Sequence, residues 1–216
     1  MRHLHPHSHS EDRIGRLIHR ARLYELSAEI GLLGRRRRLY DDLVALSGAG
    51  PGDRVLDIGS GTGYFARRAA AAVGPGGRVV GVDPSQEVID YATGRAPANC
   101  TFLVATAQAL PQRDAAVDVV LSSLAMHHLP PDDVPTALRE AYRVLRPGGR
   151  LLIADLRPAT GRIARLLGPL GRHGMRPVTG LADLIAAAGF DVTGDGERSA
   201  SFHLRLQYIQ ARRPAS

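Results

Sequence analysis

The chain has 216 residues, of which 44% are hydrophobic and 23% are charged, a composition typical of one globular domain with room for a full core. No apolar run approaches the ~18 residues that a transmembrane helix needs, and the N-terminus lacks the apolar stretch of a secretory signal. The single cysteine, Cys100, excludes an internal disulfide and a cysteine metal cluster. Together these features predict a cytoplasmic protein without a membrane span.

The net charge of +7 comes entirely from arginine, since the chain contains no lysine. More than half of this charge lies in residues 11–38, which contain eight arginines and four acidic residues. A basic stretch can attract nucleic acid or an anionic membrane. However, Arg35 to Arg38 span one helical turn, so their charges point around the helix axis, and no aromatic residues interleave to stack on bases. We therefore expect a solvated helical face and no nucleic-acid partner.

Residues 1–12 predict a disordered, histidine-rich tail. Four histidines alternate along it, at His3, His5, His7 and His9. An extended chain could hold a metal loosely there, but the tail can also be a mere appendage, and we assign no metal site.

Residues 13–48 predict a helical N-terminal cap. The apolar positions from Ile14 to Ala28 follow helical periodicity, and a second helix is expected over Arg35–Leu46. The glycine- and proline-rich stretch at 48–52 ends it.

Residues 49–216 predict a domain in which strands and helices alternate. The expected strands are Val55–Ile58, Arg78–Asp83, Cys100–Ala105, Val117–Ser123, Arg150–Asp155, Phe190–Asp195 and Leu204–Ala211. Four helices are expected: from the glycine loop to Val73, Pro84–Thr93, Val134–Leu145 and Ala182–Ala188. The "RPGG" stretch is expected to end the third of them. Continuous apolar strands separated by helices are typical of an α/β fold with a parallel sheet covered on both faces, and the short link between the last two strands predicts an antiparallel pair.

The loop after the first strand combines glycines with an acid. "VLDIGSGTGYF" places Asp57 two residues before Gly59, Gly61 and Gly63. A carboxylate would repel a pyrophosphate by roughly 1–4 kcal/mol, and the spacing G-x-G-x-G differs from the dinucleotide fingerprint G-x-G-x-x-G. Both points favour a ligand with a cationic end and no phosphate, such as S-adenosylmethionine, with the glycines allowing it to approach the backbone.

Asp83 ends the second strand, 20 residues after Gly63. An acid at this strand end can accept hydrogen bonds from both ribose hydroxyls of a nucleoside. The alternative is a helix N-cap next to Pro84.

With these residues in view, the sequence resembles the class I S-adenosylmethionine-dependent methyltransferases. The resemblance covers about residues 54–210 and is closest to the small-molecule branch that includes the ubiquinone/menaquinone C-methyltransferases. It rests on the successive motifs "VLDIGSGTGYF", "VVGVDPS", "ATAQALPQRDAAVDVVLSSLAMHHL", "EAYRVLRPGGRLLIADL" and "LIAAAGFDV". It implies a Rossmann-like, seven-stranded, mostly parallel sheet with an antiparallel last strand.

The resemblance also implies cofactor-binding roles, with Asp57 facing the methionine ammonium and Asp83 holding the ribose. The remaining implied contacts are Gly59, Gly61 and Thr62 beside the methionine and ribose, Thr106 and Ala107 beside the adenine, and Ser123 near the ligand. Thr106 departs from the family pattern, because many relatives have Asp or Asn there to hydrogen-bond the adenine amino group.

Two side chains are candidate catalytic residues. His127, in "AMHHLP" just past the fourth strand, can act as a base or contact the acceptor, as His128 can less directly. Tyr24 lies on the apolar face of the first helix and reaches the acceptor if that helix covers the pocket. The alternatives are loop packing for the histidines and a core position for Tyr24. An acceptor-side insertion is expected over 156–180, where arginines favour either an anionic acceptor or plain solvent exposure.

The leading interpretation is therefore an enzyme that methylates O, N or C of a small molecule. Methyl transfer needs alignment of donor and acceptor, and a base only where the acceptor must lose a proton. A nucleic-acid methyltransferase is the first alternative, although "LPPDD" differs from the N-P-P-aromatic motif of enzymes acting on exocyclic base amines. A non-catalytic cofactor-binding module is the second.

Overall fold

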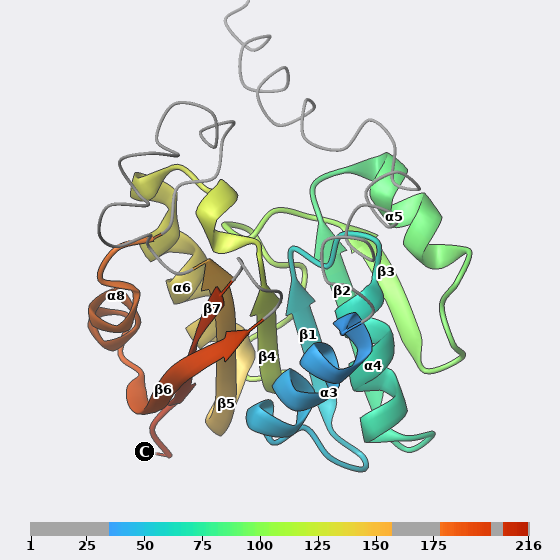
Figure 1. Ribbon diagram of the computed structural model, residues 1–216, viewed down its shortest axis with the longest axis horizontal. Helices are drawn as coiled ribbons and strands as arrows, with labels where there is room; N and C mark the ends of the chain where they lie inside the picture. The colour runs from blue at the N-terminus through green and yellow to red at the C-terminus, as the bar shows by residue number, and fades with distance from the viewer. Residues whose placement is uncertain (1–34, 157–177, 200–204, 216) are drawn as a thin grey trace, which may run out of the picture.

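The computed structural model describes residues 35–156, 178–199 and 205–215. Its centre is a seven-stranded sheet with the order β3-β2-β1-β4-β5-β7-β6 (Figure 1). The strands are β1 Arg54–Ile58, β2 Arg78–Asp83, β3 Cys100–Val104, β4 Val117–Ser123, β5 Leu145–Leu156, β6 Asp191–Ser199 and β7 Arg205–Arg212. Strands β1 to β5 are parallel, and β7 lies antiparallel between β5 and β6. The predicted sheet, including its antiparallel last strand, is confirmed.

The described helices occupy the predicted stretches to within two residues at each end. They are α3 Arg36–Ser47, α4 Tyr64–Val73, α5 Gln86–Thr93, α6 Val134–Val144 and α8 Leu181–Ala187, with 3₁₀ turns η1 Met126–His128 and η2 Pro131–Asp133. None of these described helices combines the length and apolar character that crossing a bilayer requires.

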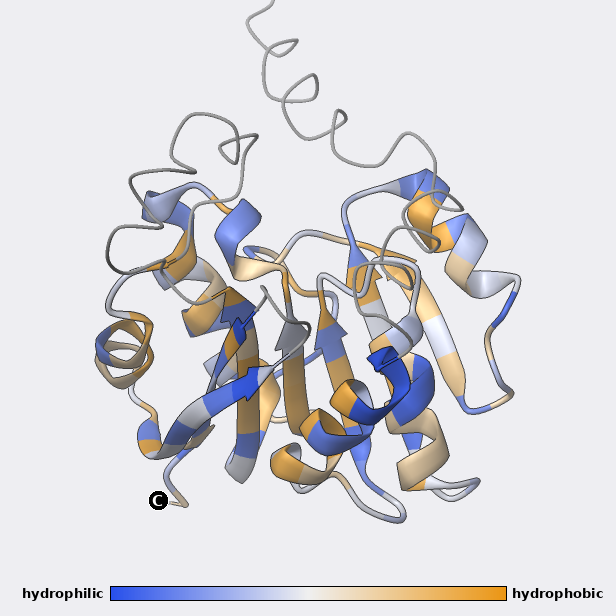
Figure 2. Cartoon of the chain, in the orientation of Figure 1, coloured by the Kyte–Doolittle hydropathy of each residue, from blue (hydrophilic) through white to orange (hydrophobic). Residues whose placement is uncertain are grey.

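Helices cover both faces of the sheet. One apolar cluster packs α3, α4 and α5 against one face, with α3 and α4 in front of the sheet in Figure 1, and a second packs α6 and α8 against the other. Successive side chains of β1 point to opposite faces of the sheet, since Val55 belongs to the first cluster and Leu56 to the second. Figure 2 shows the resulting band of hydrophobic residues along the central strands. Because side chains alternate, Asp57 faces the same side as Val55, toward α4.

The "RPGG" stretch differs from its prediction. It ends α6 as expected, but β5 already begins at Leu145, so the stretch lies inside the strand. The register between β4 and β5 shifts between Val117 and Val119, which identifies a bulge. The Arg146 guanidinium donates to the Asp118 carboxylate over 2.6 Å and holds the bulged segment against β4. No local pattern reveals this contact, because Asp118 and Arg146 are 28 residues apart.

The start of α5 also differs. Pro84 was expected to begin the helix, but the helix begins at Gln86. The Asp83 carboxylate accepts a hydrogen bond of 3.0 Å from the Ser85 amide, and this local turn keeps Pro84 and Ser85 outside the helix.

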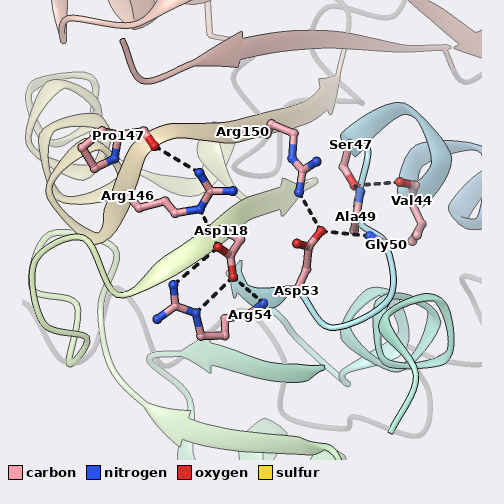
Figure 3. A network of polar contacts seen from close by, with 10 residues as sticks. All are labelled: Val44, Ser47, Ala49, Gly50, Asp53, Arg54, Asp118, Arg146, Pro147 and Arg150. Atoms are coloured by element: carbon pink, nitrogen blue, oxygen red, sulfur yellow. Dashed lines mark hydrogen bonds and ion pairs between the residues drawn. The ribbon is translucent and has the colours of Figure 1, made fainter. Parts of the chain in front are cut away.

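Acidic residues join the strands at the edge where the parallel strands begin (Figure 3). Asp118 of β4 accepts from the backbone amide of Arg54 over 2.8 Å and from its Nε over 3.0 Å, in addition to Arg146. Beside it, Asp53 accepts from Arg150 of β5 over 2.6 Å. These contacts cross-link β1, β4 and β5 at the edge opposite the glycine loop.

We predict that the Asp118 contacts stabilise the fold in a pH-dependent way. Arg54 and Arg146 hold the pKa of Asp118 well below its ordinary value, although partial burial opposes them. A lowered pKa contributes stability that is complete above the unfolded value of about 4 and is lost as the pH falls below it. Asp118→Asn should therefore lose about 1–2 kcal/mol of unfolding free energy at pH 7 and less at pH 3.

The measurement is urea unfolding of the wild type and the variant at both pH values. A difference that stays constant between pH 7 and pH 3 would show that the ionised carboxylate does not stabilise the sheet.

Candidate functional site

The glycine loop connects β1 to α4 and bends over the end of β2. The amides of Gly59 and Ser60 both donate to the Val82 carbonyl over 2.9 Å, and the Gly63 amide donates back to the Ser60 carbonyl. All three glycines have a positive φ, of 71° at Gly59, 52° at Gly61 and 77° at Gly63. This conformation favours glycine, so the backbone path alone explains much of the motif.

Only one of the three glycines faces open space. A Cβ on Gly59 would overlap the Ala125 methyl group, and a Cβ on Gly63 would overlap the Phe102 ring, whereas nothing described lies within 4 Å of a Cβ on Gly61. Protein packing against Ala125 and Phe102 is therefore a second reason for glycine at Gly59 and Gly63, while the cofactor contact expected at Gly59 stays a prediction. Gly61 is the position at which a ligand can approach the bare backbone.

Asp83 links the loop to the neighbouring strand. Its carboxylate accepts hydrogen bonds of 3.0 Å from the Gly61 and Ser85 amides. Burial raises its pKa, and these two amides oppose the rise. The N-cap of α5 is Ser85, so the alternative expectation of Asp83 as the N-cap is wrong, and Asp83 closes the turn before the helix instead. Each Asp83 oxygen keeps a further lone pair, and the ribose role stays a prediction.

Asp57 is a buried carboxylate with an unsatisfied atom. The residue is 1% exposed, and its Oδ2 has no hydrogen-bond partner among the described residues. Burial raises the pKa of Asp57 to about 8, the Asp83 charge adds to the rise, and the backbone amide of Ala66 opposes it. Such a group is costly unless a cation or donor arrives to compensate it.

Other unsatisfied oxygens lie close by. Among the described residues, the buried side-chain oxygens without a hydrogen-bond partner include Ser60 Oγ, in the loop, and Ser123 Oγ, at the end of β4. Ser123 follows Ser122, which pairs with Ile58 directly before the loop. Buried polar atoms are normally satisfied, so their concentration here indicates a place completed by water or a ligand.

The two residues expected beside the adenine follow β3. Thr106 is exposed and forms an isolated bridge with Ala109, while Ala107 is buried. The Ala105 amide donates to the Asp83 carbonyl over 3.2 Å, which places this turn beside the end of β2. Thr62, in the glycine loop, is buried, and its carbonyl accepts from Arg67 over 2.8 Å.

His127 is buried against Asp155, a residue that the sequence analysis did not select. Asp155 lies at the end of β5 and accepts from the His127 backbone amide over 3.0 Å, while its second oxygen pairs with the ring Nδ1. The His128 ring lies 4.0 Å from the His127 ring, centroid to centroid. Although much of His128 is exposed, desolvation of its protein-facing side and the neighbouring His127 lower its pKa to about 4.

Asp155 could have been found by the same signal that selected Asp83, since both are acids at the carboxyl end of a parallel strand. Tyr24, the tail at 1–12, the first part of the cap and residues 157–177 of the insertion lie outside the described residues.

The predicted cofactor residues converge on one edge of the sheet. They belong to the ends of β1, β2 and β4 or to the loops that follow β1 and β3, and the strand order reverses between β1 and β4. In open α/β sheets, ligands bind at the carboxyl ends of the strands at such a reversal. The site therefore offers two neighbouring carboxylates, one open glycine and several unsatisfied oxygens to a ligand with a cationic end.

Comparison with known proteins gives a consistent result. The sequence profile described as "Methyltransferase domain" matches residues 55–149. The chain is 34% identical over 169 residues to the ubiquinone/menaquinone biosynthesis C-methyltransferase of Ectopseudomonas mendocina (strain ymp), covering 74% of this chain and 65% of that protein's length. It is 38% identical over 116 residues to the arsenite methyltransferase of Halobacterium salinarum, covering 52% of this chain and 29% of that one.

The fold has a solved counterpart in an S-adenosylmethionine-dependent methyltransferase from Aquifex aeolicus. The TM-score is 0.67 at 22% identity, and the match covers 81% of this chain and 89% of that one.

The contrast between Gly61 and Gly63 predicts different costs for the same substitution. Gly63→Ala adds overlap with Phe102 to an unfavourable φ and should lower the unfolding free energy by about 2–4 kcal/mol. Gly61→Ala meets no neighbour and should cost only about 1 kcal/mol. Urea unfolding of both variants measures this, and equal losses would contradict the packing role of Gly63.

The raised pKa of Asp57 predicts that the unfolding free energy falls as the pH rises. Below pH 4 both the folded and unfolded states hold the proton, whereas between about 4 and 8 only the unfolded state ionises, so the fold loses stability until the folded pKa is passed. Asp57→Asn removes this loss. Its unfolding free energy relative to wild type should therefore rise by at least about 2 kcal/mol between pH 4 and pH 8.

Chemical denaturation across this range gives the difference directly. A variant that gains no stability relative to wild type as the pH rises would show that Asp57 is not held protonated in the fold.

Proposed function

The chain belongs to the class I S-adenosylmethionine-dependent methyltransferases, and from this premise we propose that it transfers a methyl group to O, N or C of a small-molecule acceptor. The observation that carries the proposal is the pair of carboxylates at the glycine loop. Neither Asp57 nor Asp83 supplies the positive charge that a phosphate-bearing nucleotide would need, and Asp57 keeps an unsatisfied buried oxygen that a cation or a hydrogen-bond donor would satisfy.

The family implies S-adenosyl-L-methionine as the cofactor, and the residues present fit it. Asp57 would face the cationic methionine end, the bare backbone at Gly61 would admit the ligand, and Asp83 would hold the ribose hydroxyls. Ser123 and the Thr106–Ala107 turn would line the same crevice. When bound, the cofactor supplies a methyl group already activated on a sulfonium.

The residues of this chain would then mainly bind, orient and exclude water. Holding two reactants in line can account for much of the acceleration of such a displacement. His127 is our candidate base for acceptors that must lose a proton, and Tyr24 is our candidate for contact with the acceptor or the sulfonium. We propose the N-terminal cap and the 156–180 segment as the acceptor side.

The similarity to enzymes named for a quinone and for arsenite supports a small-molecule acceptor. The chain spans only 65% of the quinone enzyme's length, so we do not propose that enzyme's quinone as the acceptor of this protein.

The decisive experiment incubates the purified full chain with methyl-labelled cofactor and a cell extract separated into small-molecule, protein and nucleic-acid fractions. Mass spectrometry should find label and the mass of one added methylene group in a small molecule. Label in RNA instead, together with salt-sensitive RNA binding, would favour the nucleic-acid alternative. Tight cofactor binding without label in any fraction would favour a non-catalytic module.

Asp83→Ala should weaken binding of S-adenosylhomocysteine by about ten- to a hundredfold, because charge-assisted hydrogen bonds of this kind contribute roughly 1.5–3 kcal/mol. Titration calorimetry measures the change. Asp90→Ala is the matched control, since Asp90 is an aspartate on α5 whose carboxylate binds only Gln86 among the described contacts. Unchanged affinity in Asp83→Ala would remove Asp83 from the ribose role.

A further inference from the structure

The Asp155–His127 pair joins the end of β5 to η1, the 3₁₀ turn that follows the neighbouring parallel strand β4. Asp155 is 3% exposed and His127 is 4% exposed. The Asp155 carboxylate receives the His127 backbone amide at Oδ2 and the Leu156 amide at Oδ1, over 3.0 and 2.6 Å, and Oδ1 also faces the His127 ring at Nδ1. One carboxylate thus fixes both the main chain and the ring of His127.

This pair lies next to the glycine loop. η1 begins directly after Ala125, the residue whose methyl group excludes a side chain at Gly59. Leu124, one residue earlier, has a φ of 55° and donates its amide to the Ala154 carbonyl over 2.9 Å. A positive φ is unusual and unfavourable for leucine, so the surrounding structure imposes the path of this turn.

The hydrogen-bond pattern determines the ring tautomer. An ionised carboxylate only accepts hydrogen bonds, and the His127 and Leu156 amides can only donate. The ring nitrogen that faces Oδ1 must then carry its hydrogen, so Nδ1 is protonated and the neutral ring keeps its lone pair on Nε2.

Stability alone is a weak reason for such a pair. Burying a carboxylate against an imidazole carries a desolvation penalty, and well-packed apolar side chains of similar size often serve the fold equally well. A buried carboxylate that orients an imidazole and offsets its positive charge is, by contrast, what a general base requires.

We propose that Asp155 is a positioning residue that holds His127 in the Nδ1-protonated tautomer, so that Nε2 takes the proton from the methyl acceptor. The inference rests on the proposed methyltransferase function and extends it to a second residue. The proton moves from the acceptor's O–H, N–H or acidic C–H to Nε2, and the electron pair that bonded it stays on the acceptor as the nucleophile. The imidazolium formed is balanced by Asp155 and returns its proton to water after turnover.

The first test reads the tautomer without any turnover. Long-range ¹⁵N NMR of the full chain, with His127→Gln used to assign the signals, should show Nδ1 protonated and Nε2 unprotonated at neutral pH. In Asp155→Asn, the new NH₂ group must face either the ring or a backbone donor, so the Nδ1-protonated form should no longer dominate. A wild-type ring protonated at Nε2 alone would overturn the proposal.

The second test separates positioning from structural support. With the acceptor identified by the labelling experiment, Asp155→Asn should lower kcat about 100-fold or more, while the Kd for S-adenosylhomocysteine stays close to wild type. The urea midpoint should fall, because one buried donor loses its acceptor, but the variant should remain folded under assay conditions. Adding Asp155→Asn to His127→Gln should lower kcat no further, because Asp155 acts through His127. The matched control is Asp132→Asn, an exposed aspartate in the adjacent turn η2, which should leave kcat unchanged.

The outcomes that would contradict the positioning role differ from the outcome that would contradict the proposed function. If Asp155→Asn lowers cofactor affinity and stability but leaves kcat intact, the pair is structural and the proposal fails. If Asp155→Asn still lowers kcat strongly in the His127→Gln background, Asp155 acts independently of His127 and the proposal also fails. If the wild type binds S-adenosylhomocysteine but methylates nothing, the proposed function fails and the proton-accepting role fails with it, while the NMR result still reports the tautomer.

Discussion

The hydrogen bond from the Gly61 amide to the Asp83 carboxylate ties the loop after β1 to the end of β2. Around it, the Gly59 and Ser60 amides converge on Val82, and the same carboxylate shapes the start of α5. This tie sets the path of the loop and with it the open face of Gly61, while pairing with β2 and β4 holds Asp57 and its unsatisfied oxygen just before the loop. The geometry of the candidate site therefore depends on one strand-end acid.

Buried carboxyl groups are the second constraint on this edge of the sheet. Burial raises the pKa of Asp57, and the charge of Asp83 adds to the rise. Such an arrangement reduces stability in the free protein and makes a cationic ligand the natural counterpart. At the opposite edge the acids Asp118 and Asp53 are paired with arginines (Figure 3), and these ion pairs cross-link the strands of the sheet.

Much of this structure was predictable because its signals are local. Apolar runs separated by turn residues located the seven strands, and glycine spacing with a strand-end acid indicated the sheet edge where Asp57 and Asp83 lie. The errors involve contacts distant in sequence. The "RPGG" stretch lies in β5, where Arg146 donates to the distant Asp118 carboxylate. At Gly59 and Gly63 a side chain would overlap Ala125 and Phe102, which are also distant in sequence. Asp155 carries the same strand-end signal as Asp83, but its partner His127 lies 28 residues away in η1, so their pairing appears only in the fold.

The sequence by itself determined the order and kind of the elements, the antiparallel last strand and the family resemblance. Periodicity, turn residues and motif spacing act over a few neighbouring residues, so a single chain can display them. Only the tertiary structure decided which glycine is open, that Asp83 serves both the loop and α5, that Asp57 keeps an unsatisfied oxygen, and that Asp155 faces His127. These facts depend on which strands become neighbours, because distances and burial between distant residues exist only once the sheet has formed.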